Sequence, residues 1–192
     1  MHTTKAIIFD LYGVMGLNAW QRFKNEHFGD RPAVWQGLQS LGQQVDAGNA
    51  TNEEFAVAVA NAAGVSEAEV RQKFDQTRPN TPLLNWVEKE LRGTYKLGLL
   101  SNASRDVLHT IFTAGERAMF DAAVTSFHVG LTKPAPAIYS IICKELGVEP
   151  TECIMVDDQT RHLETATNLG MKTVLYRSVD QATSEIEKLL PA

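Results

Sequence analysis

The stretch from Lys5 to Val14, KAIIFDLYGV, constrains the fold more than any other part of this 192-residue chain. Residues 6–9 form an unbroken apolar run, which predicts a strand buried on both faces of a parallel sheet. The run ends at Asp10, and Gly13 marks a turn shortly after it. Because α/β folds bind ligands at the carboxyl edge of the sheet, Asp10 is a candidate functional residue. Taken alone, Asp10 could equally be an ordinary turn residue.

A long helical stretch follows this strand. Residues 15–80 carry apolar side chains at helical spacing, which predicts four short helices. The signals that separate these helices are two glycine stops and two capping boxes: Gly29, Gly42, Thr51 with Glu54, and Ser66 with Glu69. Connections in α/β units are usually about 2–6 residues long, so this one is far too long. We therefore expect residues 15–80 to form a helical cap domain, inserted into a core domain of residues 1–14 and 81–192.

From residue 81 onward, strands alternate with helices. The expected strands are 95–100, 122–125, 154–156 and 172–176, and the expected helices are 82–91, 104–113, 136–146, one ending at 169 and one beginning at 180. This alternation predicts right-handed crossovers and a parallel sheet. The expected fold class is α/β, with a parallel Rossmann-like sheet flanked by helices and a small all-helical cap inserted after the first strand.

Polar side chains stand at the ends of several strands. They are Asp10 and Tyr12, then Ser101 and Asn102, then Lys133 in the loop 130–134, and finally Asp157 and Asp158. Each has an ordinary interpretation, as a turn or helix cap or, for the lysine, as a solvated loop residue. Because the carboxyl ends of parallel strands lie on one edge of the sheet, however, the whole set is expected to converge on one crevice. Their combination favours a functional site.

With these residues in view, the sequence resembles the haloacid dehalogenase superfamily over nearly its whole length, in the subgroup with a helical cap after the first strand. The resemblance rests on four motifs: FDLYGV, LLSNAS, GLTKPAPAIY and MVDDQTRHLETATNLGM. Their pattern is most similar to that of the small sugar-phosphate phosphatases and the phosphatase domains associated with epoxide hydrolases. The four motifs together are specific, whereas any single one is weak.

The resemblance implies that Asp10 is the nucleophile, that Ser101 and Asn102 hold the transferring group, and that Lys133 neutralises charge. A carboxylate can attack a phosphomonoester only where the negative charges of both are neutralised, and a lysine with a divalent cation does this. The expected product is an aspartyl phosphate, an established type of covalent intermediate. The expected activity is hydrolysis of a small phosphorylated metabolite.

The resemblance also implies a Mg²⁺ ion. Its implied ligands are Asp10, the backbone carbonyl of Tyr12 and Asp158, with Asp157 acting directly or through water. Without a cation, three clustered carboxylates would repel one another, which would raise a pKa and weaken the nucleophile. Retention of the Asp157–Asp158 pair therefore favours a metal, and the metal favours phosphate chemistry.

Tyr12 departs from the phosphatase pattern, which has a second Asp at this position as general acid and base. With a reference pKa of about 10, tyrosine is a possible proton donor but a poor base at pH 7. Tyrosine at this position is typical of the true haloacid dehalogenases, in which Asp10 would displace a halide without metal. Those enzymes lack the Asp-Asp pair and use a cap arginine, for which Arg22 and Arg31 are the candidates here. A third alternative is a catalytically weak or inactive binding protein.

The overall charge bears on the partners. The net charge is −5 and the isoelectric point is about 5.5, which argues against a broad nucleic-acid surface and favours a small ligand. No apolar run reaches the roughly 20 residues of a membrane helix, and the N-terminus lacks a signal-peptide pattern. We therefore expect a cytoplasmic protein that does not bind membranes. The sequence leaves the oligomeric state open.

Overall fold

The structure, a computed structural model, describes residues 3–17, 20–46, 48–103 and 106–191. At its centre is a parallel sheet of five strands in the order β5-β4-β1-β6-β7. The strands are β1 (Ala6–Phe9), β4 (Lys96–Ser101), β5 (Ala122–Thr125), β6 (Cys153–Asp157) and β7 (Lys172–Leu175). All five match expected strands within two residues at each end. The α/β fold class is confirmed.

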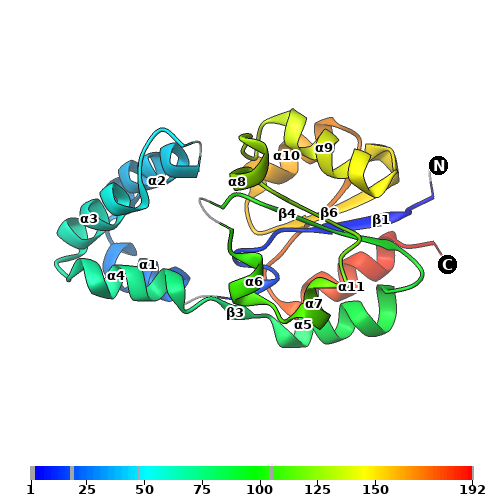
Figure 1. Ribbon diagram of the computed structural model, residues 1–192, viewed down its shortest axis with the longest axis horizontal. Coiled ribbons are helices and arrows are strands. Elements are labelled where there is room, and N and C mark those ends of the chain that lie inside the picture. Colours follow the sequence, from blue (N-terminus) through cyan, green and yellow to red (C-terminus); the bar gives the residue numbers. More distant parts are fainter. Residues whose placement is uncertain (1–2, 18–19, 47, 104–105, 192) are drawn as a thin grey trace.

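Helices cover both faces of this sheet (Figure 1). On one face lie α5 (Thr81–Trp86) with the π-helix Val87–Leu91, α6 (Leu108–Ile111), α7 (Ala114–Arg117) and α11 (Val179–Leu189); on the other lie α9 (Pro136–Leu146) and α10 (Thr160–Asn168). Two shorter elements lie in the connections: α8 (Ser126–Val129) and a 3₁₀ turn, Pro150–Glu152. A parallel sheet needs such cover because both of its faces are apolar.

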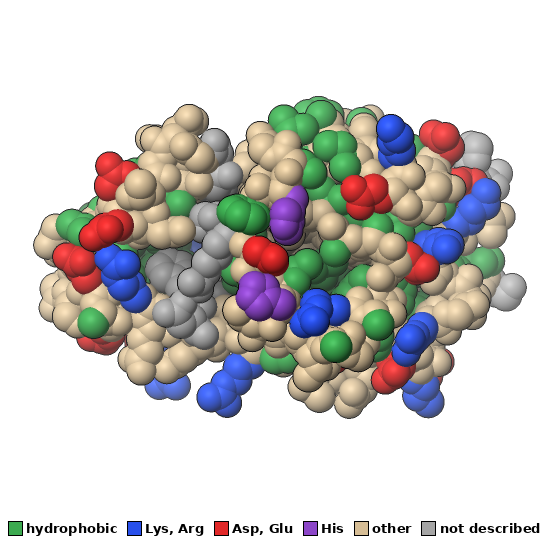
Figure 2. All heavy atoms as spheres, in the orientation of Figure 1, with side chains coloured by type: hydrophobic (Ala, Val, Ile, Leu, Met, Phe, Trp, Pro, Cys, Tyr) green, Lys and Arg blue, Asp and Glu red, His purple; other side chains and the backbone are tan. Residues whose placement is uncertain are grey.

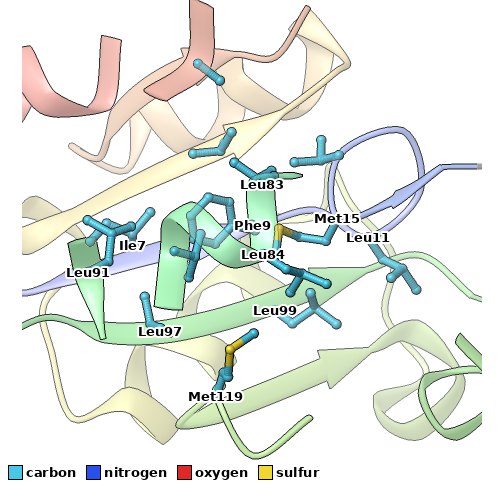
Figure 3. Close-up of a cluster of buried hydrophobic side chains, with 14 of the residues drawn as sticks. Ile7, Phe9, Leu11, Met15, Leu83, Leu84, Leu91, Leu97, Leu99 and Met119 are labelled. Atoms are coloured by element: carbon cyan, nitrogen blue, oxygen red, sulfur yellow. The ribbon is translucent and has the colours of Figure 1, made fainter. Parts of the chain in front are cut away.

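The alternation of side chains along β1 divides the apolar core in two. Ile7 and Phe9 point to the face covered by α5 and α11, and Figure 3 shows both beside Leu97 and Leu99 of β4. Ile8 points to the opposite face, toward α9 and α10. Each of these side chains is buried. The strand is thus held rigidly from both sides, which fixes the position of the residue that follows it.

The remaining helices form a separate lobe at the left of Figure 1. They are α1 (Trp20–Phe28), α2 (Pro32–Asp46), α3 (Asn52–Ala63) and α4 (Glu67–Asp75). This lobe has its own apolar cluster, in which Phe23, Val59 and Val70 are buried. The four helices match the expectation for this part of the chain.

One predicted capping box and one of the two glycine stops are confirmed, while at the second box only half is present, because Ser66 Oγ accepts from Glu69 N without a bond in return. Thr51 Oγ1 accepts a hydrogen bond from Glu54 N, while the Glu54 carboxylate accepts one from Thr51 N. Helix α1 ends at Phe28, directly before Gly29. Gly42, in contrast, was wrongly expected to end a helix, because α2 continues to Asp46. A Cβ at position 42 would lie 3.3 Å from a ring carbon of Phe55, so this glycine allows close packing of α2 on α3.

The inserted segment is not wholly helical, which corrects the expectation for residues 15–80. Its two ends pair as a short antiparallel ribbon of β2 (Gly16–Leu17) and β3 (Arg78–Pro79). Asn80, which is buried, then donates from Nδ2 to Val14 O at 2.7 Å and to Tyr176 Oη at 2.8 Å. These contacts fix the point at which the inserted segment meets the sheet. Two-residue strands have no hydrophobic period that a sequence could reveal.

The single helix expected over 104–113 is also wrong within the described residues, which exclude 104 and 105. Helix α6 covers only Leu108–Ile111, and a capping box of Thr113 with Glu116 begins α7. Phe112, between the two helices, is extended and buried. The chain therefore turns to bury an aromatic ring instead of continuing the helix.

Charged side chains of both signs are interspersed over the face of the molecule that Figure 2 shows. Within the described ranges, every helix is too short or too polar to cross a membrane.

Candidate active site at the carboxyl edge of the sheet

The strand order brings the predicted residues together. Strand β1 lies between β4 and β6, so Asp10 lies between the strand ends that carry Ser101 and Asp157. Ser101 and Asp157 are fully buried, and Asp10 is 4% exposed. Lys133 enters from the loop between α8 and α9 and is 2% exposed. The expected convergence at one sheet edge is therefore observed.

Lys133 joins two of the carboxylates. Its Nζ lies 2.8 Å from Asp10 Oδ1 and 2.6 Å from Asp157 Oδ2. Burial alone would lower the pKa of Lys133, but the two carboxylates outweigh burial and raise it. The lysine is therefore held as a cation within 3 Å of two buried negative charges.

Asp10 is held through one of its two oxygens. Oδ1 accepts a hydrogen bond from Leu11 N at 2.7 Å in addition to its contact with Lys133. Among the described residues, none donates a hydrogen bond to Oδ2. Burial raises the pKa of Asp10 well above its usual value, against the opposing charge of Lys133. One carboxylate oxygen is thus fixed in position while the other remains available for chemistry.

Asp157 uses both of its oxygens within the protein. Oδ1 accepts from Gln159 N at 2.8 Å, Oδ2 contacts Lys133, and His162 Nδ1 lies 3.1 Å from each oxygen. Burial opposes its ionisation, but Lys133 and His162 outweigh burial and lower the pKa of Asp157 to about 2. The turn bond to Gln159 shows that Asp157 also serves the ordinary role of a residue before a helix.

Asp158 completes a cluster in which one ligand oxygen from each of three aspartates, Asp10, Asp157 and Asp158, lies within 4.8 Å of the others. Partial desolvation, followed by the charge of Asp157, raises the pKa of Asp158 to about 6. Lys133 therefore does not neutralise the whole cluster. Hard oxygen donors with excess negative charge fit a cation such as Mg²⁺.

Gly13 makes room for Asp158. A Cβ built on Gly13 would lie 2.4 Å from Asp158 Oδ2, and the φ angle of Gly13 is +87°. A side chain at position 13 would be strained in this backbone conformation and would also displace the carboxylate. The glycine of the motif FDLYGV is thus required for two independent reasons.

The amide of Asn102 holds the lysine loop. Its Oδ1 accepts from Lys133 N at 2.7 Å, and its Nδ2 donates to Lys133 O at 3.0 Å. One amide hydrogen of Nδ2 is left over from these bonds. Ser101 Oγ donates to the backbone oxygen of Asn102 at 3.2 Å. The expectation that Ser101 and Asn102 bind the transferring group remains a prediction.

Tyr12 lies in the turn after β1, where its backbone bridges to Gly16, and it lines the same cleft as Asp10. Its ring is partly buried against the core cluster. The position of Tyr12 is therefore consistent with a role for either its backbone carbonyl or its phenol.

His162 was missed in the sequence. It is 1% exposed and holds Asp157 through Nδ1, while its backbone oxygen accepts from Tyr139 Oη at 2.9 Å. Burial lowers the pKa of His162. The signal that could have revealed it is its place five residues after Asp157, in the first turn of a helix that returns beside the strand end.

A cleft of about 260 Å³ opens over Asp10 between the sheet edge and the helical lobe. The sheet side contributes Asn102, Lys133 and Arg161, and the helical lobe contributes the aromatic rings of Trp20 and Trp35. Both rings pack on the apolar cluster of the helical lobe and also face the cleft.

Comparison with known proteins agrees with this architecture. A family model described as haloacid dehalogenase-like hydrolase matches residues 4–170, which is most of the chain. The chain belongs to the haloacid dehalogenase-like hydrolase family. The members of this family are hydrolases. The resemblance to this superfamily that the four motifs indicated is therefore confirmed. The aspartate and lysine at the sheet edge thus lie in a haloacid dehalogenase-like fold.

Two relatives show where the sequence similarity lies. Bifunctional epoxide hydrolase 2 of Sus scrofa is 41% identical over 73 residues, which are 38% of this chain and 13% of that protein. N-acylneuraminate-9-phosphatase of Homo sapiens is 34% identical over 89 residues, which are 45% of this chain and 36% of that protein. The matches thus span only a minor part of each relative.

Solved structures show the same fold at lower identity. A dehalogenase with an intermediate complex has a TM-score of 0.73 at 18% identity, covering 100% of this chain and 99% of that chain. A haloacid dehalogenase family enzyme from Bacteroides thetaiotaomicron, a magnesium complex, has a TM-score of 0.67 at 22% identity, covering 96% of this chain and 98% of that chain. Similarity at these identities establishes the haloacid dehalogenase fold alone.

Proposed function

We propose that this protein is a Mg²⁺-dependent phosphatase that hydrolyses a small phosphomonoester through an aspartyl-phosphate intermediate on Asp10. The observation that carries the proposal is the cluster of three aspartates within 4.8 Å, neutralised only in part by Lys133. Such a cluster suits a divalent cation, and a divalent cation suits a phosphate dianion. The phosphatase among the relatives supports the same reaction class.

In this proposal Asp10, the backbone carbonyl of Tyr12 and Asp158 hold the cation. Asp157 already accepts hydrogen bonds at both oxygens, so its contribution is through water or through the position of Lys133. When bound, Mg²⁺ would neutralise charge on the nucleophile and on the phosphate.

The reaction follows from the positions of the side chains. The free oxygen of Asp10 attacks phosphorus, the bond from phosphorus to the leaving oxygen breaks, and an acyl phosphate forms on Asp10. Lys133 offsets the charge of the attacking carboxylate, and Ser101 with Asn102 is assigned to the phosphoryl oxygens. Water then attacks phosphorus, which releases inorganic phosphate and restores Asp10.

Tyr12 takes the place of the usual general acid and base. Its phenol can donate a proton to the leaving oxygen, but it is a weak base for activating water at pH 7. Hydrolysis of the aspartyl phosphate is therefore the step that should be slow. A slow second step predicts that the phosphorylated enzyme accumulates.

We also propose that residues 15–80 act as a cap domain over a core domain of residues 1–14 and 81–192. Support comes from the separate apolar cluster of the helical lobe and from the cleft that both lobes line. In this arrangement the core supplies the reacting groups and the cap contacts the leaving group.

The first experiment measures hydrolysis of p-nitrophenyl phosphate with Mg²⁺, with EDTA, and with the Asp10→Asn variant. We expect activity with Mg²⁺ that EDTA abolishes and that the variant lacks. Asp30→Asn is the matched control, because Asp30 is highly exposed on the helical lobe. Activity that is insensitive to EDTA, or no turnover at high enzyme concentration, would contradict the proposal.

Dehalogenation of a short 2-haloacid is the second candidate, and Tyr12 is the observation that favours it. Neither cap arginine considered for that reaction lines the cleft: Arg22 pairs with Glu26 at the surface, and Arg31 donates to His27 O and Ala62 O. Release of chloride from 2-chloropropionate that chelators leave unchanged would favour this candidate. Failure of both assays, with Asp10→Asn leaving every cellular phenotype intact, would favour a non-catalytic binding protein.

A further inference from the structure

Arg161 is a cationic side chain in the cleft to which the phosphatase chemistry assigns no role. It lies in the first turn of α10, and its Nε donates to Gln159 Oε1 at 3.0 Å. Gln159 is in turn bonded through its backbone to Asp157. In the described part of the chain, no carboxylate lies within ion-pair distance of the Arg161 guanidinium. Four of its five N–H groups therefore remain for a ligand, in a side chain whose orientation is fixed.

The positive charges closest to the reacting carboxylates come from lysines and not from Arg161. Lys133 lowers the pKa of Asp10, and Lys133 and Lys24 lower that of Asp158, against the larger effect of burial on each. Lys133 is also in direct contact with Asp10, at 2.8 Å. Arg161 is thus not needed at the reacting carboxylates, so it is available for a different part of the substrate.

The wall contributed by the helical lobe is aromatic. Trp20 lies at its centre, with ring centroids 5.7 Å from Trp35 and 5.9 Å from Phe55. Beside these rings the lining carries the neutral amides of Gln39 and Gln43. Asp10 is the one carboxylate among the described residues that line the cleft. Away from the aspartate cluster, the cleft thus offers flat apolar surface, neutral hydrogen-bonding groups and one guanidinium.

We propose that Arg161 determines specificity for the leaving group, and that the preferred substrates are phosphomonoesters whose alcohol carries a second anionic group, such as a carboxylate, on a flat and largely apolar frame. This inference rests on the proposed phosphatase function. The frame packs on Trp20, Trp35 and Phe55, while the second anion forms a forked pair with the guanidinium. The transferring phosphate remains at Asp10 and Lys133.

The test compares three aryl phosphates: phenyl phosphate, 4-carboxyphenyl phosphate and 4-carbamoylphenyl phosphate. The last two have nearly the same shape and differ in charge. We expect the wild-type kcat/KM to be roughly 10- to 100-fold higher for the carboxylate than for the amide, the range of a charge-assisted pair. In Arg161→Gln this ratio should fall to about one, and in Arg161→Lys it should be intermediate because the forked geometry is lost.

The quantity compared is the ratio of kcat/KM for the carboxylate ester to kcat/KM for the amide ester, measured for each protein. The intrinsic reactivity of the two leaving groups contributes equally to this ratio in wild type and variant, so it cancels in the comparison. Arg92→Gln is the matched control, since Arg92 pairs with Glu88 before β4, at the opposite edge of the sheet, and should keep the wild-type ratio. Hydrolysis of all three esters with a wild-type ratio near one would overturn this inference alone. An equal loss for all three esters in Arg161→Gln would also overturn it, because Arg161 would then serve the transferring phosphate. If wild type hydrolyses none of the three, the phosphatase function itself falls, and this inference with it.

Discussion

Tyr12 is the residue at which this chain differs most from the phosphatase pattern. Its backbone carbonyl is a proposed ligand of the cation and is the same in any residue, so the substitution affects only the proton chemistry of the side chain. A phenol with a reference pKa of about 10 holds its proton at pH 7, whereas an aspartate can accept one from water. The identity of this side chain should therefore set the rate at which the intermediate is hydrolysed.

Tyr12→Asp should raise the steady-state phosphatase turnover, by roughly 100-fold if full general base catalysis is restored. The measurement is kcat for p-nitrophenyl phosphate at saturating Mg²⁺. Tyr12→Phe is the control, because it keeps the ring and the backbone carbonyl while removing the phenol, and it should show no such gain. A turnover of Tyr12→Asp at or below that of wild type would show that this account of the proton chemistry is wrong.

The cation site can be tested by adding a single methyl group at Gly13. Gly13→Ala would bring a Cβ to 2.4 Å from Asp158 Oδ2 at a φ of +87°, so the carboxylate must move. We expect the Mg²⁺ concentration for half-maximal activity to rise roughly 10- to 100-fold, as for other changes beside metal ligands. Gly37→Ala is the control, since a Cβ there meets no atom within 4 Å. Unchanged Mg²⁺ dependence in Gly13→Ala would exclude Asp158 as a ligand in the observed position.

At the scale of elements, the helical lobe depends on local signals. The capping box of Thr51 and Glu54 begins α3, the helix whose Phe55 and Val59 contribute to the apolar cluster of the lobe. Because Thr51 satisfies a backbone N–H that would otherwise lack a partner within the helix, its removal should destabilise the lobe directly.

Thr51→Ala should lower the free energy of unfolding by about 1 kcal/mol. The measurement is urea unfolding followed by tryptophan fluorescence, in which Trp20 and Trp35 report on the helical lobe. Ser184→Ala, on the exposed side of α11, should leave the free energy of unfolding nearly unchanged. Equal stability of Thr51→Ala and wild type would mean that tertiary packing alone holds the start of α3.

The elements also show which signals a sequence carries. Thr51 and Gly29 could be interpreted correctly because capping and helix termination are local events. Gly42 could not, because its role is a close approach to Phe55 on another helix, and nothing in the neighbouring residues reveals that contact. The β2–β3 ribbon was missed for the same reason, since its pairing joins residues that are about sixty positions apart.

At the scale of the whole molecule, the set of residues at the sheet edge was predictable because parallel strands present their carboxyl ends together. Asp10, Lys133 and Asp157 meet as expected. They form ion pairs because a buried charged group needs a partner of opposite charge. His162 could have been found from its place in the first turn after Asp157, whereas Arg161 could not, because its position in the cleft depends on how α10 packs beside β6. The aromatic wall of the cleft likewise depends on how the helical lobe sits over the sheet edge.

The central claim is that Asp10 becomes phosphorylated with the help of a divalent cation. The most direct measurement is mass spectrometry of the wild-type protein, quenched in acid during turnover of p-nitrophenyl phosphate and digested to locate the modification. We predict one phosphoryl group on the peptide that contains Asp10 with Mg²⁺ present, none with EDTA, and a smaller amount in Tyr12→Asp because its intermediate is hydrolysed faster. Turnover with no phosphoryl group on that peptide, or the same adduct in EDTA, would contradict the account.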